Sequence, residues 1–576
     1  MTENTVTGVT PDELPEALRL DRERTAIDEA ADAYYEEYLA LHPDAATIEG
    51  RPGHETEYSD YSPAGEEADV ELARRTLEAV NALEPRDAVD RVTLDVLNER
   101  LGLQIEAHLA GLGAWELNPL ATEAHGIRQI FDLMPQETAQ DWSHIVGRMA
   151  NVPAAIDGFI ETLEHHREAG RVAAARQVRL LVEQFRAYAQ SGGFFDGLAE
   201  QAVAADAGLD GSAQDAARAA AGAYRRLADH LEQVLLPEAP EEDAVGIERY
   251  RLHSRQFLGA EVDLAETYRW GVEELERIIA EQEQVAEQIR PGASIAEAKR
   301  ALDEDPARRL EGTDALREWM QRVSDRAVEF LAREHFTIEG PMRTIECMIA
   351  PTHDGGIYYT PPSADFSRPG RMWWSVPEGE TQFTTWAETS TVYHEGVPGH
   401  HLQFATGAAL ASSVNDYRAH GVWVSGHGEG WALYAERLME QLGYLEDPGD
   451  RMGMLDGQRM RAARVVFDIG VHCGFEIPQA WAERIGHSGT WTAEAGHEFL
   501  AQNLDISKGQ REFEFHRYLG WPGQAPSYKI GQRIWEQLRD EALQRGESLR
   551  EFHTRALLIG SVGLDTLRRA LQDPEA

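Results

Sequence analysis

The chain has 576 residues, enough for about two to four domain-sized units or for one large helical body. Its formal net charge is −46, and only three of its 54 lysines and arginines are lysines: Lys299, Lys508 and Lys529. So acidic a surface argues against nucleic acid or an anionic membrane as a main partner. It is typical of a halophilic protein, because high salt screens the repulsion between like charges.

The cysteines and the lengths of the apolar runs exclude further classes of protein. Cys347 and Cys473 are the two cysteines and form no C-x-x-C pair, which excludes a Cys-rich zinc site. The sequence has no apolar run of about 18 residues and no apolar signal core at its N-terminus. We therefore expect a soluble, cytoplasmic protein; the sequence leaves its oligomeric state open.

Helical patterns dominate the chain and indicate two lobes. Residues 1–20 are polar and predict a loose tail, and residues 21–236 predict an N-terminal helical lobe. The acidic stretch Pro237–Asp243 is the expected linker. Residues 244–576 then predict a second helical lobe.

Residues 336–379 interrupt the helical pattern. Three β-prone runs, Arg343–Ile349, Gly356–Thr360 and Met372–Val376, are separated by Pro and Gly. They predict a small antiparallel sheet inside the second lobe. Its edge strand could bind an extended peptide, or the sheet could be a structural flap.

The segment TVYHEGVPGHHLQ, residues 391–403, carries the main chemical signal. It has one His–Glu pair, His394 and Glu395, and one His–His pair, His400 and His401. Zinc hydrolases need two imidazoles to hold the metal and a nearby carboxylate to accept a proton from water. The usual H-E-x-x-H form is broken here, because position 398 is Pro.

Helix geometry tests which histidine can join His394. On a regular helix His400 lies about 240° around the axis, and His401 lies about 10.5 Å along it. Two ligands of one tetrahedral zinc lie within about 3.5 Å of each other, so neither fits a regular helix. Gly396 and Pro398 permit a break. We expect a distorted site with His394 and His400, and His401 as the alternative second ligand.

A third ligand is expected from the segment SGHGEGWALYAER, residues 425–437. Glu429 lies 35 residues after His394, within reach of a returning helix. Glu436 lies seven residues after Glu429, on the same helical face, where it could orient an imidazole. The alternative is that both are solvated helix carboxylates.

Two later segments hold further candidates. Arg464, Asp468 and His472 recur every four residues; His472 could contact the substrate as a catalytic group, or the three could form a structural network. In the segment RYLGWPGQAPSYKIG, residues 517–531, the Tyr528 phenol could stabilise an oxyanion. The other substrate-binding candidates are Arg517, Gln524 and Lys529 there, with Tyr359 and His401 upstream. The alternative is a structured surface loop.

Several of these motifs together resemble one family, the domain of unknown function 885. They are HEGVPGHHLQ, GEGWALYAE, DIGVH, PGQAPSYKIG, AATIEG and YYTPPSADFSRPG, and the resemblance spans about residues 25–570. The family is expected to consist of zinc metallopeptidases similar in outline to the helical gluzincins, such as the thimet-oligopeptidase and angiotensin-converting-enzyme groups. The resemblance implies a mainly α, two-lobed body with a deep central channel, a zinc at its floor and a small β-sheet beside it.

The resemblance also implies residue roles. His394, His400 and Glu429 would hold one zinc ion, Glu395 would be the general base and Tyr528 the oxyanion donor. The reaction expected is metal-assisted hydrolysis of a peptide or small amide. The rivals are a zinc hydrolase of non-peptide amides or esters, and a helical binding protein without catalysis. Glu395 argues against the last, because a structural metal site needs no base.

Overall fold

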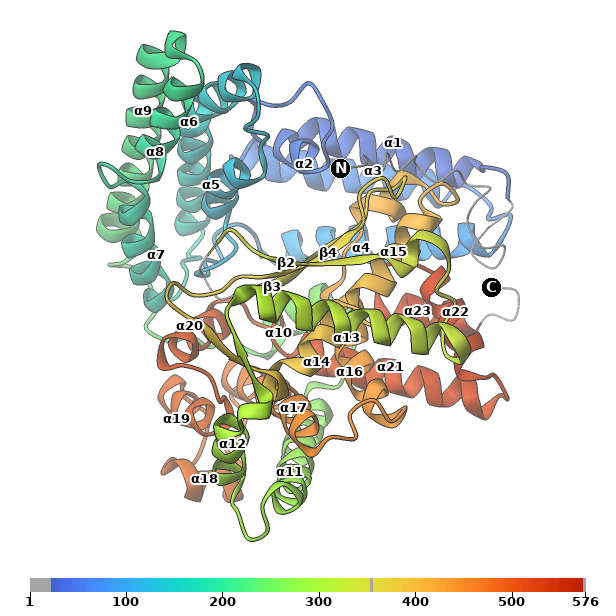
Figure 1. Cartoon of the computed structure of the whole chain (residues 1–576). Helices are drawn as coiled ribbons and strands as arrows, with labels where there is room; N and C mark the ends of the chain where they lie inside the picture. Colours follow the sequence, from blue (N-terminus) through green and yellow to red (C-terminus); the bar gives the residue numbers. More distant parts are fainter. Residues whose placement is uncertain (1–21, 353–355, 573–576) are drawn as a thin grey trace.

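The computed structural model describes residues 22–352 and 356–572 (Figure 1). The predicted tail, residues 1–20, lies outside the described residues. Within them the chain forms helices α1 to α23 and two small sheets of two and three strands. The prediction of a mainly α fold is confirmed. None of the described helices has the length and apolar character needed to cross a membrane.

Three of the first four helices, α1, α3 and α4, begin at residues whose side chains cap them. Thr25 accepts hydrogen bonds from two backbone N–H groups at the start of the first helix, and Asp87 accepts one at the start of the fourth. The helices are α1 (Ala26–Leu41), α2 (Pro43–Ile48), α3 (Pro63–Val80) and α4 (Ala88–Leu109).

The next helices surround a small core of their own. Alanines on α9, among them Ala213, Ala216 and Ala220, are fully or almost fully buried and permit close packing against neighbouring helices. The helices are α5 (Glu123–Leu133), α6 (Ala139–Glu168), α7 (Ala175–Tyr188), α8 (Phe194–Ala205) and α9 (Asp210–His230), with short turns η3 (Ala207–Leu209) and η4 (Leu231–Leu235).

The remaining helices form the body that carries the candidate site. They are α10 (Ile247–Leu258), α11 (Leu264–Ile289), α12 (Ile295–Glu304), α13 (Thr313–Glu334), α14 (Thr385–Glu395), α15 (His400–Leu410), α16 (Ser425–Gln441), α17 (Pro448–Cys473), α18 (Gln479–Ile485), α19 (Ala493–Asn503), α20 (Lys508–Gly520), α21 (Ser527–Gln544), α22 (Leu549–Leu558) and α23 (Leu564–Gln572), with short turns η5 (Pro306–Arg308), η6 (Gly340–Arg343) and η7 (Tyr417–Gly421).

The three-stranded sheet has the order β2–β4–β3 and crosses the middle of the view above α13 (Figure 1). Its strands are β2 (Ile345–Ile349), β3 (Ile357–Thr360) and β4 (Gly370–Trp374). β3 pairs antiparallel with β4, but β2 pairs parallel with it, because β4 inserts between the two earlier strands. The sheet is therefore mixed, which corrects the prediction of an antiparallel one. A second, unpredicted pair joins β1 (Arg309–Glu311) to β5 (Gln382–Thr384).

The hydrophobic cores divide the chain differently from the predicted lobes. The small core draws its buried residues from Trp115 to Leu235. The large core combines residues 31–101 with residues 250–571. Helices α1, α3 and α4 thus pack with the C-terminal body although they belong to the predicted lobe of residues 21–236, and the division into two lobes stays a prediction. The expected linker, Pro237–Asp243, has no regular helix and is held by an ion pair between Asp243 and Arg176.

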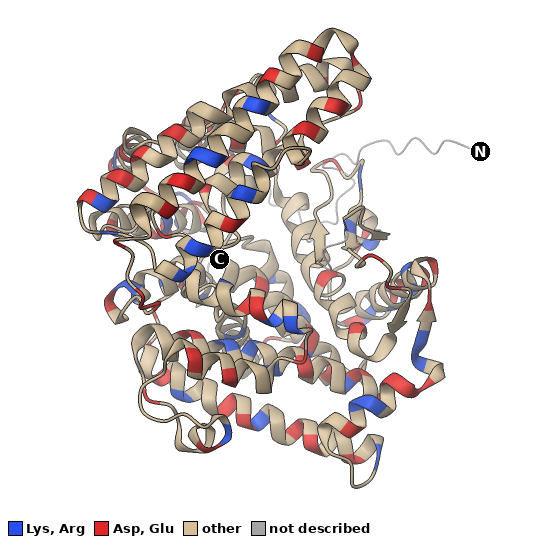
Figure 2. Ribbon diagram, turned by 90° about the vertical axis from the view of Figure 1, so that its left-hand side faces the viewer, with Lys and Arg blue, Asp and Glu red and all other residues tan. Residues whose placement is uncertain are grey.

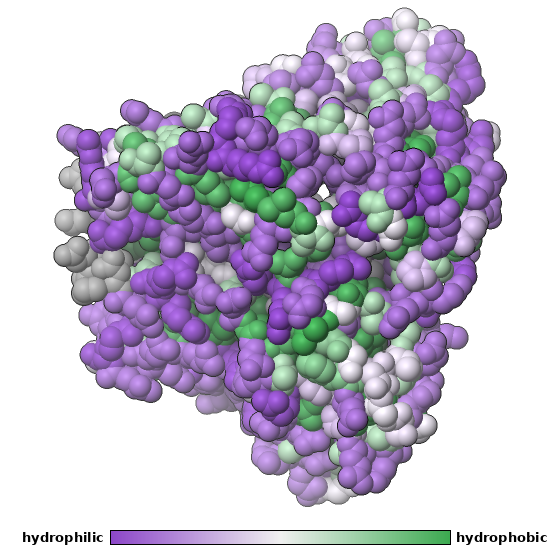
Figure 3. Space-filling model, turned by 180° about the vertical axis from the view of Figure 1, so that it is seen from behind, coloured by the Kyte–Doolittle hydropathy of each residue, from purple (hydrophilic) through white to green (hydrophobic). Residues whose placement is uncertain are grey.

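A cavity of about 710 Å³ lies where elements of the two cores meet. Its lining comes from Tyr38 of α1, His42, α3, α4, α10, the segment 112–123 and the turn 520–522, and includes none of the three predicted metal ligands. Seen from behind, apolar side chains gather across the middle of the molecule, between hydrophilic upper and lower parts (Figure 3). The predicted channel to the metal centre stays a prediction.

Acidic residues are spread over the whole described fold rather than gathered in one patch (Figure 2). Arginines lie among them and form many ion pairs, such as Arg437 with Glu281 at 2.8 Å. This pattern agrees with the net charge of −46, and the halophilic character inferred from that charge stays a prediction.

Candidate metal centre

A break between two helices brings His394 and His400 together. α14 ends at Glu395 and α15 begins at His400. A Cβ on Gly399 would lie 1.9 Å from the carbonyl oxygen of His394, and one on Gly396 would lie 2.5 Å from a backbone oxygen. Both positions therefore need glycine, and the irregular turn they permit replaces the regular helix that sequence geometry excluded.

The break is fixed onto α16. The indole Nε1 of Trp431 donates to the carbonyl oxygens of Pro398 at 2.9 Å and Gly399 at 3.2 Å. Trp431 is fully buried and lies two residues after Glu429. One side chain thus ties the turn between the two histidines to the helix of the third candidate ligand.

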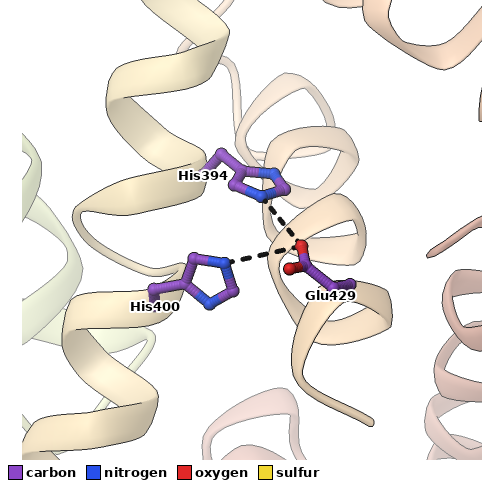
Figure 4. Close-up of side chains that lie close together, drawn as sticks. All are labelled: His394, His400 and Glu429. Carbon is purple, nitrogen blue, oxygen red and sulfur yellow. Dashed lines mark ion pairs between the residues drawn. The ribbon is translucent and has the colours of Figure 1, made fainter. Parts of the chain in front are cut away.

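Three side chains converge at this point (Figure 4). The Nε2 atom of His394 lies 3.4 Å from Oε2 of Glu429, and Nε2 of His400 lies 3.6 Å from the same oxygen. One ligand atom from each residue lies within 4.8 Å of the other two. Both histidines are buried. Distances near 3.5 Å are what two ligands of one zinc ion require, and they exceed the usual length of a hydrogen bond.

Glu436 holds the second nitrogen of His394. Nδ1 of His394 lies 2.8 Å from Oε1 of Glu436, and the Ser390 hydroxyl donates to the other carboxylate oxygen at 2.5 Å. Because Nδ1–H donates to Glu436, Nε2 is the nitrogen that faces Glu429. The predicted contact of Glu436 with an imidazole is present, and the structure shows that its partner is His394.

The electrostatics of the cluster favour charged side chains. Burial lowers the pKa of His394, but its hydrogen bonds and the charges of Glu429, Glu436 and Glu395 outweigh burial and raise that pKa to about 10. Burial raises the pKa of Glu429, but the two histidines outweigh it and hold that pKa well below its ordinary value. The cluster thus favours a positive charge beside Glu429, and a metal cation would compete with the His394 proton for the same atoms.

Glu395, the expected general base, is the last residue of α14 and is buried beside the cluster. Burial raises its pKa, an effect reduced by the charges of His400 and His394 and increased by that of Glu429. A carboxylate with a raised pKa is a better proton acceptor than an ordinary one.

Close packing of two helices places Tyr528 near Glu429. A Cβ on Gly430 would lie 2.6 Å from the backbone of Gly531, so α16 and α21 touch backbone to backbone. Tyr528 lies one turn before Gly531. Burial, and next the charge of Glu429, raise the pKa of Tyr528 to about 12, although Arg464 lowers it. Its hydroxyl is therefore protonated at neutral pH.

Both ring nitrogens of His401 form hydrogen bonds outside the metal-site cluster. Its Nε2 lies 2.9 Å from the carbonyl oxygen of Met342 and must donate to it, so Nδ1 accepts from the Tyr359 hydroxyl at 2.8 Å. Burial lowers the pKa of His401 to about 4. With no lone pair left, His401 does not suit the role of second ligand, and the structure favours His400. The pair His401–Tyr359 joins the sheet to α15, and the substrate contact predicted for both residues stays a prediction.

The residues predicted to bind the substrate, Arg517, Gln524 and Lys529, are also paired with other side chains of the protein. Arg517 is buried and pairs with Glu514 at 2.8 Å and with Oε1 of Gln524 at 2.5 Å. Lys529 is buried and donates to oxygens of Glu274, Gln532 and Gln458. These contacts use the ammonium's three donors. The structure thus gives Arg517, Gln524 and Lys529 positions in the frame of the site and does not support direct substrate contact.

His472 lies in a buried structural network. Its Nε2 donates to the carbonyl oxygen of Tyr518 at 3.0 Å, and its ring stacks on Tyr250. Asp468 bonds the Tyr250 hydroxyl at 2.6 Å, and Arg464 bonds the Tyr518 hydroxyl at 2.5 Å. The three residues at intervals of four thus bond different partners, which matches the structural alternative and not a catalytic His472.

Three residues near the candidate metal centre were not identified from the sequence. Ser390 lies four residues before His394 on one helix face, a spacing that could have found it. Arg461, on α17, acts by its charge on Glu395 and Tyr528, and its Nε is buried without a hydrogen-bond partner among the described residues. Trp423 precedes the SGHGEG segment, and no local pattern marks it.

The fold and the cluster together define a mainly helical protein with a buried site of two histidines and one carboxylate. Its sequence matches the family described as "Bacterial protein of unknown function (DUF885)" over residues 43–571. The chain therefore belongs to this family, as its motifs predicted. No curated protein matches the chain.

Two solved structures have a similar fold. The crystal structure of a "putative lipoprotein" from Colwellia psychrerythraea has a TM-score of 0.77 and 21% identity, covering 95% of this chain and 98% of that one. The structure of a "putative lipoprotein of unknown function" from Shewanella oneidensis has a TM-score of 0.73 and 16% identity, covering 96% and 100%. Identities this low show the fold alone. The expected cytoplasmic location stays a prediction.

Proposed function

We propose that the protein is a zinc-dependent hydrolase, a metallopeptidase acting on short peptides or chain ends. The observation that carries the proposal is the convergence of His394, His400 and Glu429 on one point, with Glu395 buried beside them. A structural ion site needs the three ligands but not the adjacent base.

The donor set suits zinc. Two imidazole nitrogens and one carboxylate oxygen are the three protein ligands of a common type of catalytic zinc site, in which one position stays open. Glu436 fixes the ring of His394 through its other nitrogen, as expected around such a site. A bound zinc ion would supply a Lewis acid that lowers the pKa of water and polarises a carbonyl group.

The chain's own residues would then move the protons. Glu395 accepts a proton from the attacking water and passes it to the leaving amine, a task for which its raised pKa suits it. Tyr528 donates a hydrogen bond to the oxyanion of the tetrahedral intermediate, and its raised pKa keeps that proton in place.

The test combines metal content with hydrolysis of peptides, small amides and esters at high salt. The proteins compared are wild type, His400→Ala, His401→Ala and Glu395→Gln. We expect about one zinc per chain in wild type, loss of zinc in His400→Ala but not in His401→Ala, and a zinc-loaded but inactive Glu395→Gln.

The other outcomes separate the rivals. Cleavage of amides or esters with intact peptides would replace the peptidase by a hydrolase of other substrates. Zinc binding without any cleavage would favour a binding protein. Retention of zinc in the variant lacking His400 would overturn the assigned site.

A further inference from the structure

Three aromatic rings form a column beside the candidate metal centre. Tyr359 of β3 stacks on Phe404 of α15, with ring centroids 5.8 Å apart and planes at 24°. Phe404 stacks in turn on Trp423, which lies in the loop before α16, at 5.4 Å and 11°. The column thus runs from the sheet across α15 to the helix that carries Glu429.

The column borders a ligand residue. Phe404 lies one turn after His400 on α15, and their ring centroids are 6.0 Å apart. The ring of Trp423 lies 6.5 Å from the ring of His400. A group that contacts the end of the column therefore lies next to the atoms that would act on a substrate.

The rings of the column are held in place. Tyr359 is bonded through its hydroxyl to His401. A Cβ on Gly428 would lie 2.1 Å from the Trp423 ring, so this glycine, directly before Glu429, lets the indole lie against α16. A side chain fixed in this way loses little conformational entropy when a ligand binds.

Trp423 nevertheless remains 48% exposed. Leaving so much of an indole in water forgoes a hydrophobic contribution of about 25 cal/mol per Å². The neighbouring rings use their faces for stacking on each other. A further flat apolar group can extend the column in the same way, because offset-stacked rings attract beyond the area they bury.

We propose that Trp423, backed by Phe404, forms a subsite for an aromatic side chain of the substrate next to the bond that is cleaved. This inference rests on the proposed hydrolase function and specifies its substrates. Trp423 would determine specificity and take no part in the proton transfers.

The test uses peptides that differ only in Phe, Ala or Lys at one position, with that position moved along the peptide. The proteins are wild type, Trp423→Ala, Trp423→Phe and the control Phe513→Ala, which removes another exposed aromatic from α20. The readouts are kcat/KM, zinc content, and equilibrium binding of each peptide to the zinc-loaded Glu395→Gln protein with and without each change.

We expect a preference of about 10-fold or more for Phe over Ala at one position. Trp423→Ala should remove most of that preference, Trp423→Phe should retain it, and Phe513→Ala should leave it unchanged, with zinc content equal in all. Equal binding of Phe and Ala peptides by the zinc-loaded Glu395→Gln protein, a preference for Lys, or no peptide binding at all would overturn the inference.

The binding readout separates this inference from the hydrolase proposal. If no substrate is cleaved but the zinc-loaded protein binds Phe peptides through Trp423, the hydrolase proposal fails and the subsite stands. If peptides are cleaved without regard to the side chain, the hydrolase proposal stands and the subsite fails.

Discussion

Two clusters of buried charged side chains near Tyr528 are built in opposite ways. In the metal-site cluster, His394, His400 and Glu429 approach at 3.4 and 3.6 Å, beyond the usual hydrogen-bond length. In the arginine cluster, Arg464 and Arg517 contact Glu514 at 3.2 and 2.8 Å. The first leaves its atoms converging on one point, while the second pairs two guanidinium groups with one carboxylate at hydrogen-bond distance.

This difference in pairing distinguishes a candidate ligand-binding site from the structural residues around it. In the sequence, the segment with His394 carries the main chemical signal, while Arg464 and Arg517 are candidates that each have a structural alternative. Geometry distinguishes them, because a ligand can only bind where polar atoms are not already paired. Variants should therefore affect metal affinity in one cluster and stability in the other.

The arginine cluster should respond most strongly to loss of its carboxylate. Glu514→Gln leaves two buried guanidinium groups facing each other, and we expect the free energy of unfolding to fall by about 3–5 kcal/mol. Glu512→Gln, on the same helix but more exposed, should cost about 0–1 kcal/mol. Denaturant unfolding measures both. Equal effects, or loss of zinc with the fold intact, would contradict the distinction.

The buried carboxyl group of Asp468 should make the free energy of unfolding depend on pH. Burial raises its pKa to about 7, although Tyr250 and Gly523 bond it. Between about pH 4 and pH 7 the folded protein keeps a proton that the unfolded chain releases, so stability falls by up to about 1.4 kcal/mol per pH unit as pH rises. In Asp468→Asn this contribution disappears. An unchanged slope in unfolding measured from pH 4 to 8 would show that Asp468 is ionised when folded.

In the metal-site cluster, loss of Glu436 should weaken metal binding and not the fold. Glu436→Gln removes the charged acceptor that orients His394, and we expect zinc affinity to fall about 10–100-fold. Glu440→Gln, one turn further along α16, should leave affinity unchanged, because Glu440 pairs with Arg437 and Arg451. Competition with a chelator measures both affinities, and equal losses would exclude an orienting role.

The backbone contact between α16 and α21 gives a further test, in which packing alone is changed. In Gly430→Ala the new Cβ meets the backbone of Gly531, and overpacking should cost about 1–3 kcal/mol while moving Glu429. Gly407→Ala on α15 has open space around its Cβ and should stabilise by about 0.5–1 kcal/mol. Thermal unfolding compares them; a neutral Gly430→Ala would show that α16 and α21 can separate without cost.

Local signals in the sequence were enough for the helices and for much of the candidate site. The mainly α fold follows from helical periodicity, and the three converging residues follow from types that metals prefer. Helix geometry also required a break after Glu395. It could not choose between His400 and His401, because that choice depends on the backbone of Met342, which lies 59 residues from His401 along the chain.

Other features depend on contacts that no local pattern encodes. Arg517 and Lys529 have the charge that a substrate carboxylate needs, yet partners as distant as Glu274 occupy the lysine. The parallel pairing of β2 and β4 and the packing of α1 to α4 with the C-terminal body are likewise long-range. Charge and periodicity report what a residue can do, and only the fold decides whether its partners are already present.

The division of the cores has a consequence for how the chain is made. The small core uses one continuous stretch and can close soon after it leaves the ribosome. The large core joins α4 to α23, linked by the ion pair of Asp95 with Arg569. At about 5–20 residues per second, the roughly 450 residues between them take roughly 20 to 90 seconds to synthesise. Until then the surface of α4 that packs against α23 lacks this partner, so nascent chains should need protection by chaperones during that interval.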